Sequence, residues 1–256
     1  MSETAGKPAE LVHYEVVDRV AAITLDSPHN RNALSRQLVT ELFDRLERAD
    51  ADDEVLVVVL RSSGRVFCSG ADLSEATTVP MHEAAGAIVR LQRLIVAHSK
   101  PVVVVVEGAA RAGGIGIVAA ADLAIVAEDA TFALTEVKLG LAAAIISLTV
   151  FHRMHPRAAA LAALGGEVFS GADAASYGLV TKAVPADRLD GEVSELLASI
   201  TTGAAQGLRE TKRVLNRELL ARIDAGGEEM VQLSARLFGS DAAKEAMTAF
   251  LGRRKA

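Results

Sequence analysis

The fold is decided by the stretch Glu107-Gly108-Ala109-Ala110-Arg111-Ala112-Gly113-Gly114-Ile115-Gly116, a glycine-bearing turn between two apolar runs. The run before it, Val102 to Val106, has the valine-rich composition of a buried strand. The run after it, Ile115 to Ala121, contains only Gly116 as a helix breaker and is compatible with a helix. A buried strand that turns directly into a helix indicates an α/β fold with mostly parallel strands.

An earlier turn, Phe67-Cys68-Ser69-Gly70-Ala71-Asp72-Leu73, also follows a predicted buried strand, Val55 to Leu60. Here Gly70 gives the backbone the freedom to expose the N–H group of Ala71. In the later turn, the N–H group of Gly113 lies at a helix start, where the helix dipole is positive. Two N–H groups directed at one point form an oxyanion hole. The two turns therefore predict a site that polarises a carbonyl group.

A carboxylate follows the turns, in the apolar segment Phe132-Ala133-Leu134-Thr135-Glu136-Val137. Burial raises the pKa of a carboxyl group toward values that suit proton transfer near neutral pH. We therefore predict that Glu136 is the acid–base group of the site. From its position alone, Glu136 is equally compatible with an exposed glutamate or a salt-bridge partner of Lys138.

The remaining chain shows a change of pattern near residue 187. Before it, residues 11–25 alternate as a hairpin with Asp18-Arg19 at its turn, Ser35 can cap a helix, and helix-compatible residues run from Met81 to Ala97. After it, consecutive helices have apolar faces that favour burial against another subunit. We predict a core over residues 1–190 that carries the site and a C-terminal helical region over residues 191–256.

Composition narrows the classes of function. The 256 residues are 50% hydrophobic, enough for a sizeable core, and the net charge of −6 disfavours nucleic acid as a partner. The single cysteine, Cys68, excludes an intrachain disulfide and is interpreted as a small core residue. No apolar run has the length of a membrane span, and His152 and His155 lack a third ligand at metal-site spacing. We expect a cytoplasmic protein with no bound metal and no membrane partner.

Taken in order, five segments resemble the crotonase (enoyl-CoA hydratase/isomerase) family. They are Asn32-Ala33-Leu34-Ser35, Phe67 to Leu73, Gly108 to Asp122, Thr135 to Gly140, and the closing segment Asp241 to Lys255. The resemblance covers nearly the whole chain. It implies a spiral of repeated ββα units and a C-terminal helical region used for trimer formation, often within hexamers.

The resemblance also implies the ligand, an acyl-CoA thioester, in which coenzyme A is part of the substrate and no separate cofactor is needed. The thioester oxygen would lie between the N–H groups of Ala71 and Gly113, with Glu136 as the acid–base group. The other substrate-binding residues that it implies are Arg31, Ala33, Gly70, Asp72, Leu73, Gly114, Gly116 and Arg253.

The chain departs from the family's hydratase pattern at one position that matters. Hydratases of the family usually carry two glutamates; the second matches Glu136, but the first falls on Gly116, which has no side chain. Ala142-Ala143-Ala144 also replaces the usual proline and glycines. We favour a hydratase that acts through Glu136 alone. The alternatives are a Δ3,Δ2-enoyl-CoA isomerase, a catalytically silent acyl-CoA-binding subunit, and, as a minor option, a hydrolase or decarboxylase of the family.

Overall fold

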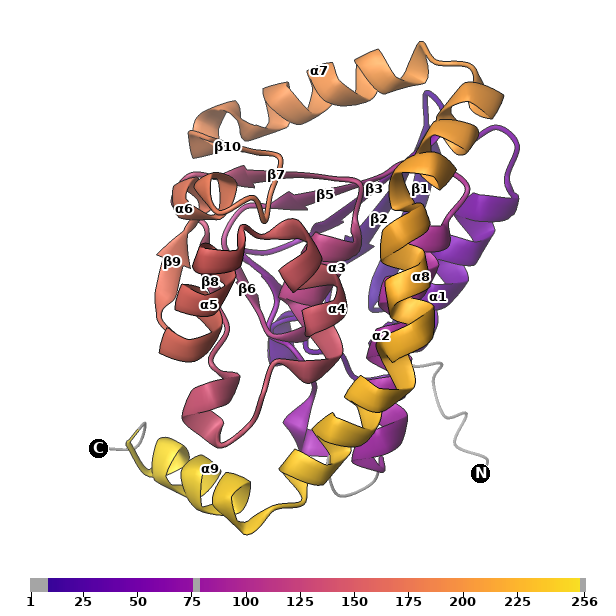
Figure 1. Ribbon diagram of the computed structural model, residues 1–256. Coiled ribbons are helices and arrows are strands. Elements are labelled where there is room, and N and C mark those ends of the chain that lie inside the picture. The colour runs from indigo at the N-terminus through magenta and orange to yellow at the C-terminus, as the bar shows by residue number, and fades with distance from the viewer. Residues whose placement is uncertain (1–8, 76–78, 254–256) are drawn as a thin grey trace, which may run out of the picture.

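The computed structural model describes residues 9–75 and 79–253, without the side chains of Leu73 and of residues 250–253 (Figure 1). Two sheets form its centre. The strand order of the six-stranded sheet is β1 (Val12–Val17), β2 (Val20–Leu25), β3 (Val57–Ser62), β5 (Val102–Val106), β7 (Leu123–Ala127) and β10 (Lys182–Val184). That of the four-stranded sheet is β4 (Val66–Cys68), β6 (Ala109–Arg111), β8 (Thr131–Ala133) and β9 (Val168–Ser170).

Helices surround the sheets and form the C-terminal part of the chain (Figure 1). The α-helices are α1 (Arg36–Ala51), α2 (Met81–Ala97), α3 (Gly113–Ala120), α4 (Ala144–Arg153), α5 (Pro156–Gly165), α6 (Gly171–Ser176), α7 (Leu189–Thr201), α8 (Ala205–Phe238) and α9 (Asp241–Arg253). The short 3-10 helices are η1 (Pro28–Asn30), η2 (Leu73–Glu75), η3 (Glu136–Leu139) and η4 (Ala186–Arg188).

A ββα unit recurs along the chain as β3-β4-α2, β5-β6-α3 and β7-β8-α4. In each unit the first strand joins the large sheet and the second joins the small one. Neighbouring strands are parallel except in the pairs β1–β2 and β8–β9. The predicted α/β class with mostly parallel strands and ββα units is confirmed.

The N-terminal hairpin forms as predicted. Asp18 and Arg19 both have positive φ, 48° and 68°, which is the backbone of a two-residue type I′ turn. The next strand is shifted from the prediction, because β3 begins at Val57 rather than Val55. Its register with β2 runs from Val20↔Val57 to Leu25↔Ser62, so strand pairing, not the start of the apolar run, sets its ends.

The helices α1 and α2 also agree with the sequence pattern. The Oγ atom of Ser35 accepts a hydrogen bond from the N–H group of Leu38 at 3.3 Å and caps α1. The helix predicted from Met81 to Ala97 has these bounds as α2. Both helices direct apolar side chains into the core, which ties the first half of the chain to the sheets.

The consecutive C-terminal helices begin with α7 at Leu189, close to residue 187, where the sequence pattern changes. α8 packs against α2 and α4, and α9 turns back beneath the sheets to contact η3 (Figure 1). On α8, Val214 and Leu215 are about 70% exposed. The division at residue 190 and the association of subunits through these helices stay predictions.

A buried ion pair attaches α8 to the core. The Nζ atom of Lys212 on α8 lies 2.8 Å from Asp122 Oδ2. It also donates hydrogen bonds to the backbone oxygens of Ile95 at 2.9 Å and Lys100 at 3.0 Å. Asn216, one helical turn further on, donates to the other carboxylate oxygen of Asp122 at 2.7 Å. Burial lowers the pKa of Lys212, and the opposing effect of Asp122 is smaller. The ammonium group is fully hydrogen-bonded and therefore structural.

Candidate active site

The two glycine-bearing turns meet in the folded chain. Gly70 has a φ of 93°, which favours glycine. A Cβ atom at Gly70 would lie 2.9 Å from Ala112 Cβ and 3.6 Å from Gly113 N. The first turn is also held by a hydrogen bond from Leu34 N to Gly70 O at 2.8 Å. Glycine at position 70 thus lets the two turns approach each other closely.

The predicted donors lie on this contact. Ala112 adopts φ 44° and ψ −118°, and the chain enters α3 at Gly113. Within the part of the chain that the structure describes, the N–H groups of Ala71 and Gly113 have no hydrogen-bond acceptor. The first N–H groups of a helix have no intrahelical partner and lie at its positive end. Both groups are therefore available to an oxygen atom placed between the turns.

Glu136 is the first residue of η3 and is held in an apolar setting. Its Oε2 atom is buried and has no hydrogen-bond partner among the described residues. Burial raises the pKa of this carboxyl group, and its own backbone N–H lowers it to a smaller extent. The alternative salt bridge does not form, because the Nζ atom of Lys138 contacts Glu167 Oε1 at 2.8 Å.

A cavity of about 400 Å³ lies between the first turn and Glu136, and Ala112, the residue before Gly113, also lines it. Among the predicted site residues, Arg31, Ala71 and Glu136 line it. The other residues that line it are not among those predicted from the sequence. They are Val66, Ser69, Ala109, Arg111, Ala112, Thr135, Leu139, Leu141, Phe238 and Met247. Arg111 could have been noticed, because it is the one basic residue inside the later turn. Phe238 and Met247 come from distant helices, and no local pattern marks them.

Other predicted residues lie beside the cavity rather than on its wall. Ala33 is 5% exposed and belongs to the core. Asp72 braces its own turn, because its Oδ1 accepts a hydrogen bond from Ser74 N at 2.9 Å and its Oδ2 accepts one from Asn30 at 2.9 Å. Gly114 is buried in α3 against Cys68. Contacts of these residues with a ligand stay predictions.

The side chains of Leu73 and Arg253 lie outside the described part of the chain, so the predictions for them are not addressed by the geometry. Cys68 is fully buried, and burial raises the pKa of its thiol to about 12. That agrees with its interpretation as a core residue. Among the described residues, no group of three or more His, Cys, Asp or Glu side chains could hold a metal ion. Nor does any described helix combine the length and apolar character needed to cross a bilayer.

The family model for enoyl-CoA hydratase/isomerase matches residues 15–256. The chain belongs to the crotonase superfamily. It is therefore an enzyme of the enoyl-CoA hydratase/isomerase family.

Individual members of the superfamily cover almost the whole chain. A crystal structure of an enoyl-CoA hydratase from Mycobacterium avium is 41% identical, has a TM-score of 0.90, and is matched over 96% of this chain and 97% of its own. A mevalonyl-coenzyme A hydratase of Aspergillus fumigatus is 30% identical over 92% of this chain and 90% of its own length. A peroxisomal Δ(3,5)-Δ(2,4)-dienoyl-CoA isomerase of Arabidopsis thaliana is 27% identical over 100% and 98%.

The first glutamate that the resemblance implies for hydratases of the crotonase family has no room at position 116. A Cβ atom there would lie 2.6 Å from Ile146 Cγ2 and 3.0 Å from Gln92 Oε1. Gln92 is itself held in place, since it accepts a hydrogen bond from Thr149 Oγ1 at 2.7 Å and donates one to Ile145 O at 2.9 Å. The space beside Gly116 is therefore filled by an isoleucine and a buried glutamine. Glu136 is the only carboxylate that lines the cavity within the described residues.

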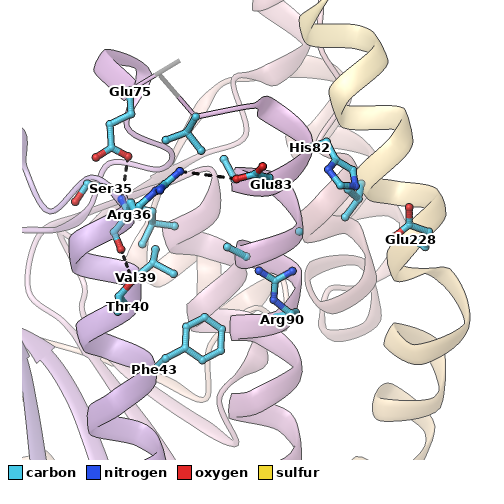
Figure 2. Close-up of a pocket in the computed structure, with 16 residues that line it drawn as sticks. Ser35, Arg36, Val39, Thr40, Phe43, Glu75, His82, Glu83, Arg90 and Glu228 are labelled. Carbon is cyan, nitrogen blue, oxygen red and sulfur yellow. Dashed lines mark hydrogen bonds and ion pairs between the residues drawn. The ribbon is translucent and has the colours of Figure 1, made fainter. Parts of the chain in front are cut away.

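A second pocket, separate from the cavity beside Glu136, lies between α1, α2 and α8 and has a volume of about 370 Å³ (Figure 2). Its wall mixes apolar and charged side chains, and Arg36 pairs with Glu83 at 3.8 Å. Leu34 is one of the residues that line it. A Cβ atom on Gly113 would lie 2.7 Å from Leu34 Cδ1, so this leucine separates the pocket from the turn that carries the predicted donor.

Proposed function

We propose that the chain is an enoyl-CoA hydratase that adds water to a 2-enoyl-CoA thioester. The observation that carries the proposal is the buried, unpartnered Oε2 atom of Glu136, on a cavity that Ala71 also lines. Several relatives are named as hydratases, among them the Mycobacterium avium protein, which supports this choice. The thioester oxygen would accept hydrogen bonds from the N–H groups of Ala71 and Gly113.

The proposed chemistry needs one carboxylate and two donors. Water addition turns the thioester into an enolate-like anion, whose charge collects on the oxygen between the turns. By analogy with other oxyanion holes, each N–H donor contributes about 3 kcal/mol to this step. Glu136 takes a proton from the attacking water and returns one to the carbon next to the thioester carbonyl. Both transfers occur on the same face of the substrate, so a single group can serve both.

The second candidate is a Δ3,Δ2-enoyl-CoA isomerase, and the filled space at Gly116 favours it. A double-bond shift needs only one base that moves a proton between two carbons. No second carboxylate is needed to hold a water molecule. The Arabidopsis thaliana relative, named as a dienoyl-CoA isomerase, supports keeping this alternative.

A direct assay separates the candidates. The purified protein is offered crotonyl-CoA, a branched 2-enoyl-CoA and a 3-enoyl-CoA, and the absorbance of the conjugated thioester is followed. Hydration removes this absorbance with 2-enoyl substrates, whereas isomerisation creates it with the 3-enoyl substrate. If neither changes while coenzyme A thioesters still bind, the chain is a silent acyl-CoA-binding subunit and the proposal is wrong.

We expect a restored carboxylate at position 116 to favour hydration. Gly116→Glu alone would clash with Ile146, so the variant combines it with Ile146→Gly, and Ile146→Gly alone is the control. The ratio of hydration to isomerisation should rise by up to about 10²-fold, because a second acid–base group would help to hold and activate water. Equal effects on both rates would argue against a role of this position in water activation.

Two further features belong to the same proposal. The chain would act in the cytoplasm as a homotrimer or a homohexamer, and exposed apolar residues such as Leu161 and Leu164 on α5 support association. Arg31, on the cavity wall, would contact the coenzyme A nucleotide together with Arg253. Sedimentation of the purified protein tests the oligomeric state.

A further inference from the structure

Arg111 is an arginine without a counter-ion on the wall of the candidate active site. It ends strand β6, two residues before Gly113, and lines the same cavity as Glu136. No carboxylate of the described residues pairs with it. Burial lowers the pKa of its guanidinium group, with no acidic neighbour opposing the effect. A guanidinium group remains charged even so.

Neutral acceptors hold one side of this guanidinium group. Nη1 donates to Ala110 O at 2.9 Å and also to Thr131 O. Nη2 donates to Thr131 Oγ1 at 3.0 Å. The two bonds to Thr131 occupy the Nη1–Nη2 edge and fix the group against β8, and the bond to Ala110 uses the remaining hydrogen of Nη1. The other edge, formed by Nε–H and the second hydrogen of Nη2, has no acceptor among the described residues.

The free edge has the geometry for an oxyanion. Two parallel N–H groups of arginine match the two oxygens of a carboxylate or a phosphate. A partly buried charge without a partner is costly, and a bound anion removes that cost. Because bonds to Thr131 and Ala110 already orient the side chain, little further ordering is needed when an anion binds.

We propose that Arg111 anchors an anionic group of the ligand, either a carboxylate on the acyl group or a phosphate of coenzyme A. The proposal rests on the proposed thioester ligand and extends it to a residue that selects among thioesters. Arg111 is then a specificity-determining residue, while Glu136 performs the proton transfers.

The test measures binding of four unreactive thioesters by calorimetry. They are butyryl-CoA, glutaryl-CoA, butyryl-pantetheine and glutaryl-pantetheine, so that an acyl carboxylate and the nucleotide phosphates vary independently. The variant is Arg111→Gln. The matched control is Arg213→Gln, which removes the same charge from an exposed position on α8, about 37 Å along the helix from Phe238 at the cavity.

Two patterns support the proposal and name the anion. If the acyl carboxylate binds Arg111, the variant weakens both glutaryl thioesters by about tenfold or more and leaves butyryl-pantetheine unchanged. If a phosphate binds, both coenzyme A thioesters weaken and both pantetheine thioesters do not. Arg213→Gln should change none of them. Arg111→Lys keeps the charge but loses the two-pronged edge, so it should show a smaller loss with the same selectivity.

Equal weakening of all four ligands, or no change in any, would overturn the proposal. If Arg111→Gln does not fold, Arg111→Lys and the salt dependence of glutaryl against butyryl binding decide the question. Failure of the proposed function can be told apart from failure of this proposal. If the chain turns over no enoyl-CoA but Arg111→Gln weakens thioester binding in one of these patterns, the hydratase proposal is wrong and the role of Arg111 stands. If the chain hydrates crotonyl-CoA but Arg111→Gln changes the binding of no thioester, the proposed role of Arg111 is wrong and the proposed hydratase function stands.

Discussion

Glu136→Gln is expected to lower the turnover number by about 10²-fold or more, the largest effect on activity that we predict. Glutamine has the shape of glutamate but cannot take up a proton. Substrate binding should change little, because the N–H donors at Ala71 and Gly113 are not touched. Steady-state kinetics with the substrate that the wild-type chain accepts measures the effect.

The same variant should be more stable than the wild-type chain at neutral pH. Burial raises the pKa of Glu136 in the folded state above its ordinary value near 4.5, so the folded chain holds this proton more tightly than the unfolded chain. The stabilisation is fully present below pH 4.5 and is lost as pH rises through the raised pKa. Replacing the carboxylate by a neutral amide removes that loss.

Thermal unfolding as a function of pH tests whether Glu136→Gln is more stable than the wild-type chain at neutral pH. The melting temperature of Glu136→Gln should exceed that of the wild-type chain by an amount that grows with pH above about 4.5 and then levels off. Glu167→Gln is the control, because Glu167 is 81% exposed and, among the described residues, pairs with Lys138 alone. A melting difference that does not depend on pH, or near-normal turnover, would contradict the assignment of Glu136 as a buried base.

Lys212→Met is expected to lower the free energy of unfolding by about 3–5 kcal/mol, the largest effect on stability. Methionine fills a similar volume but leaves the carboxylate of Asp122 buried without its cation. The backbone oxygens of Ile95 and Lys100 also lose their donor. Denaturant titration measures the loss.

The control for this variant is Lys182→Met. Lys182 pairs with Glu192, but its side chain is 52% exposed, so its loss should cost at most about 1 kcal/mol. Replacing Asp122 as well would not restore the wild-type stability, because Asp122 also accepts a hydrogen bond from Val102 N at 2.7 Å. Similar small losses in both lysine variants would show that the buried pair does not anchor α8.

Local chemistry explains which parts of the fold could be predicted. Asp18-Arg19, the cap at Ser35 and the run Met81 to Ala97 each depend on neighbours within a few residues, and each prediction is confirmed. Strands β4, β6 and β8 span only three residues each, too few to show a period of two. Their pairing into a second sheet comes from contacts between units, which a single-sequence pattern does not contain.

The candidate site also has parts that the sequence could predict and parts that it could not. The turns and Glu136 could be found because glycine and a lone carboxylate stand out in apolar segments. The lining by Phe238 and Met247 could not, since α8 and α9 reach the cavity only through tertiary packing. Nor could the sequence reveal that Ile146 and Gln92 fill the space beside Gly116, because these residues are 30 and 24 positions away.

That filled space restricts how the chain can change over evolutionary time. A mutation that introduces glutamate at position 116 first meets Ile146, and one that shortens Ile146 first leaves a void beside a hydrogen-bonded glutamine. Each single substitution is therefore harmful until the other has occurred. A lineage with this pair of residues therefore cannot gain a second carboxylate at position 116 by one neutral step.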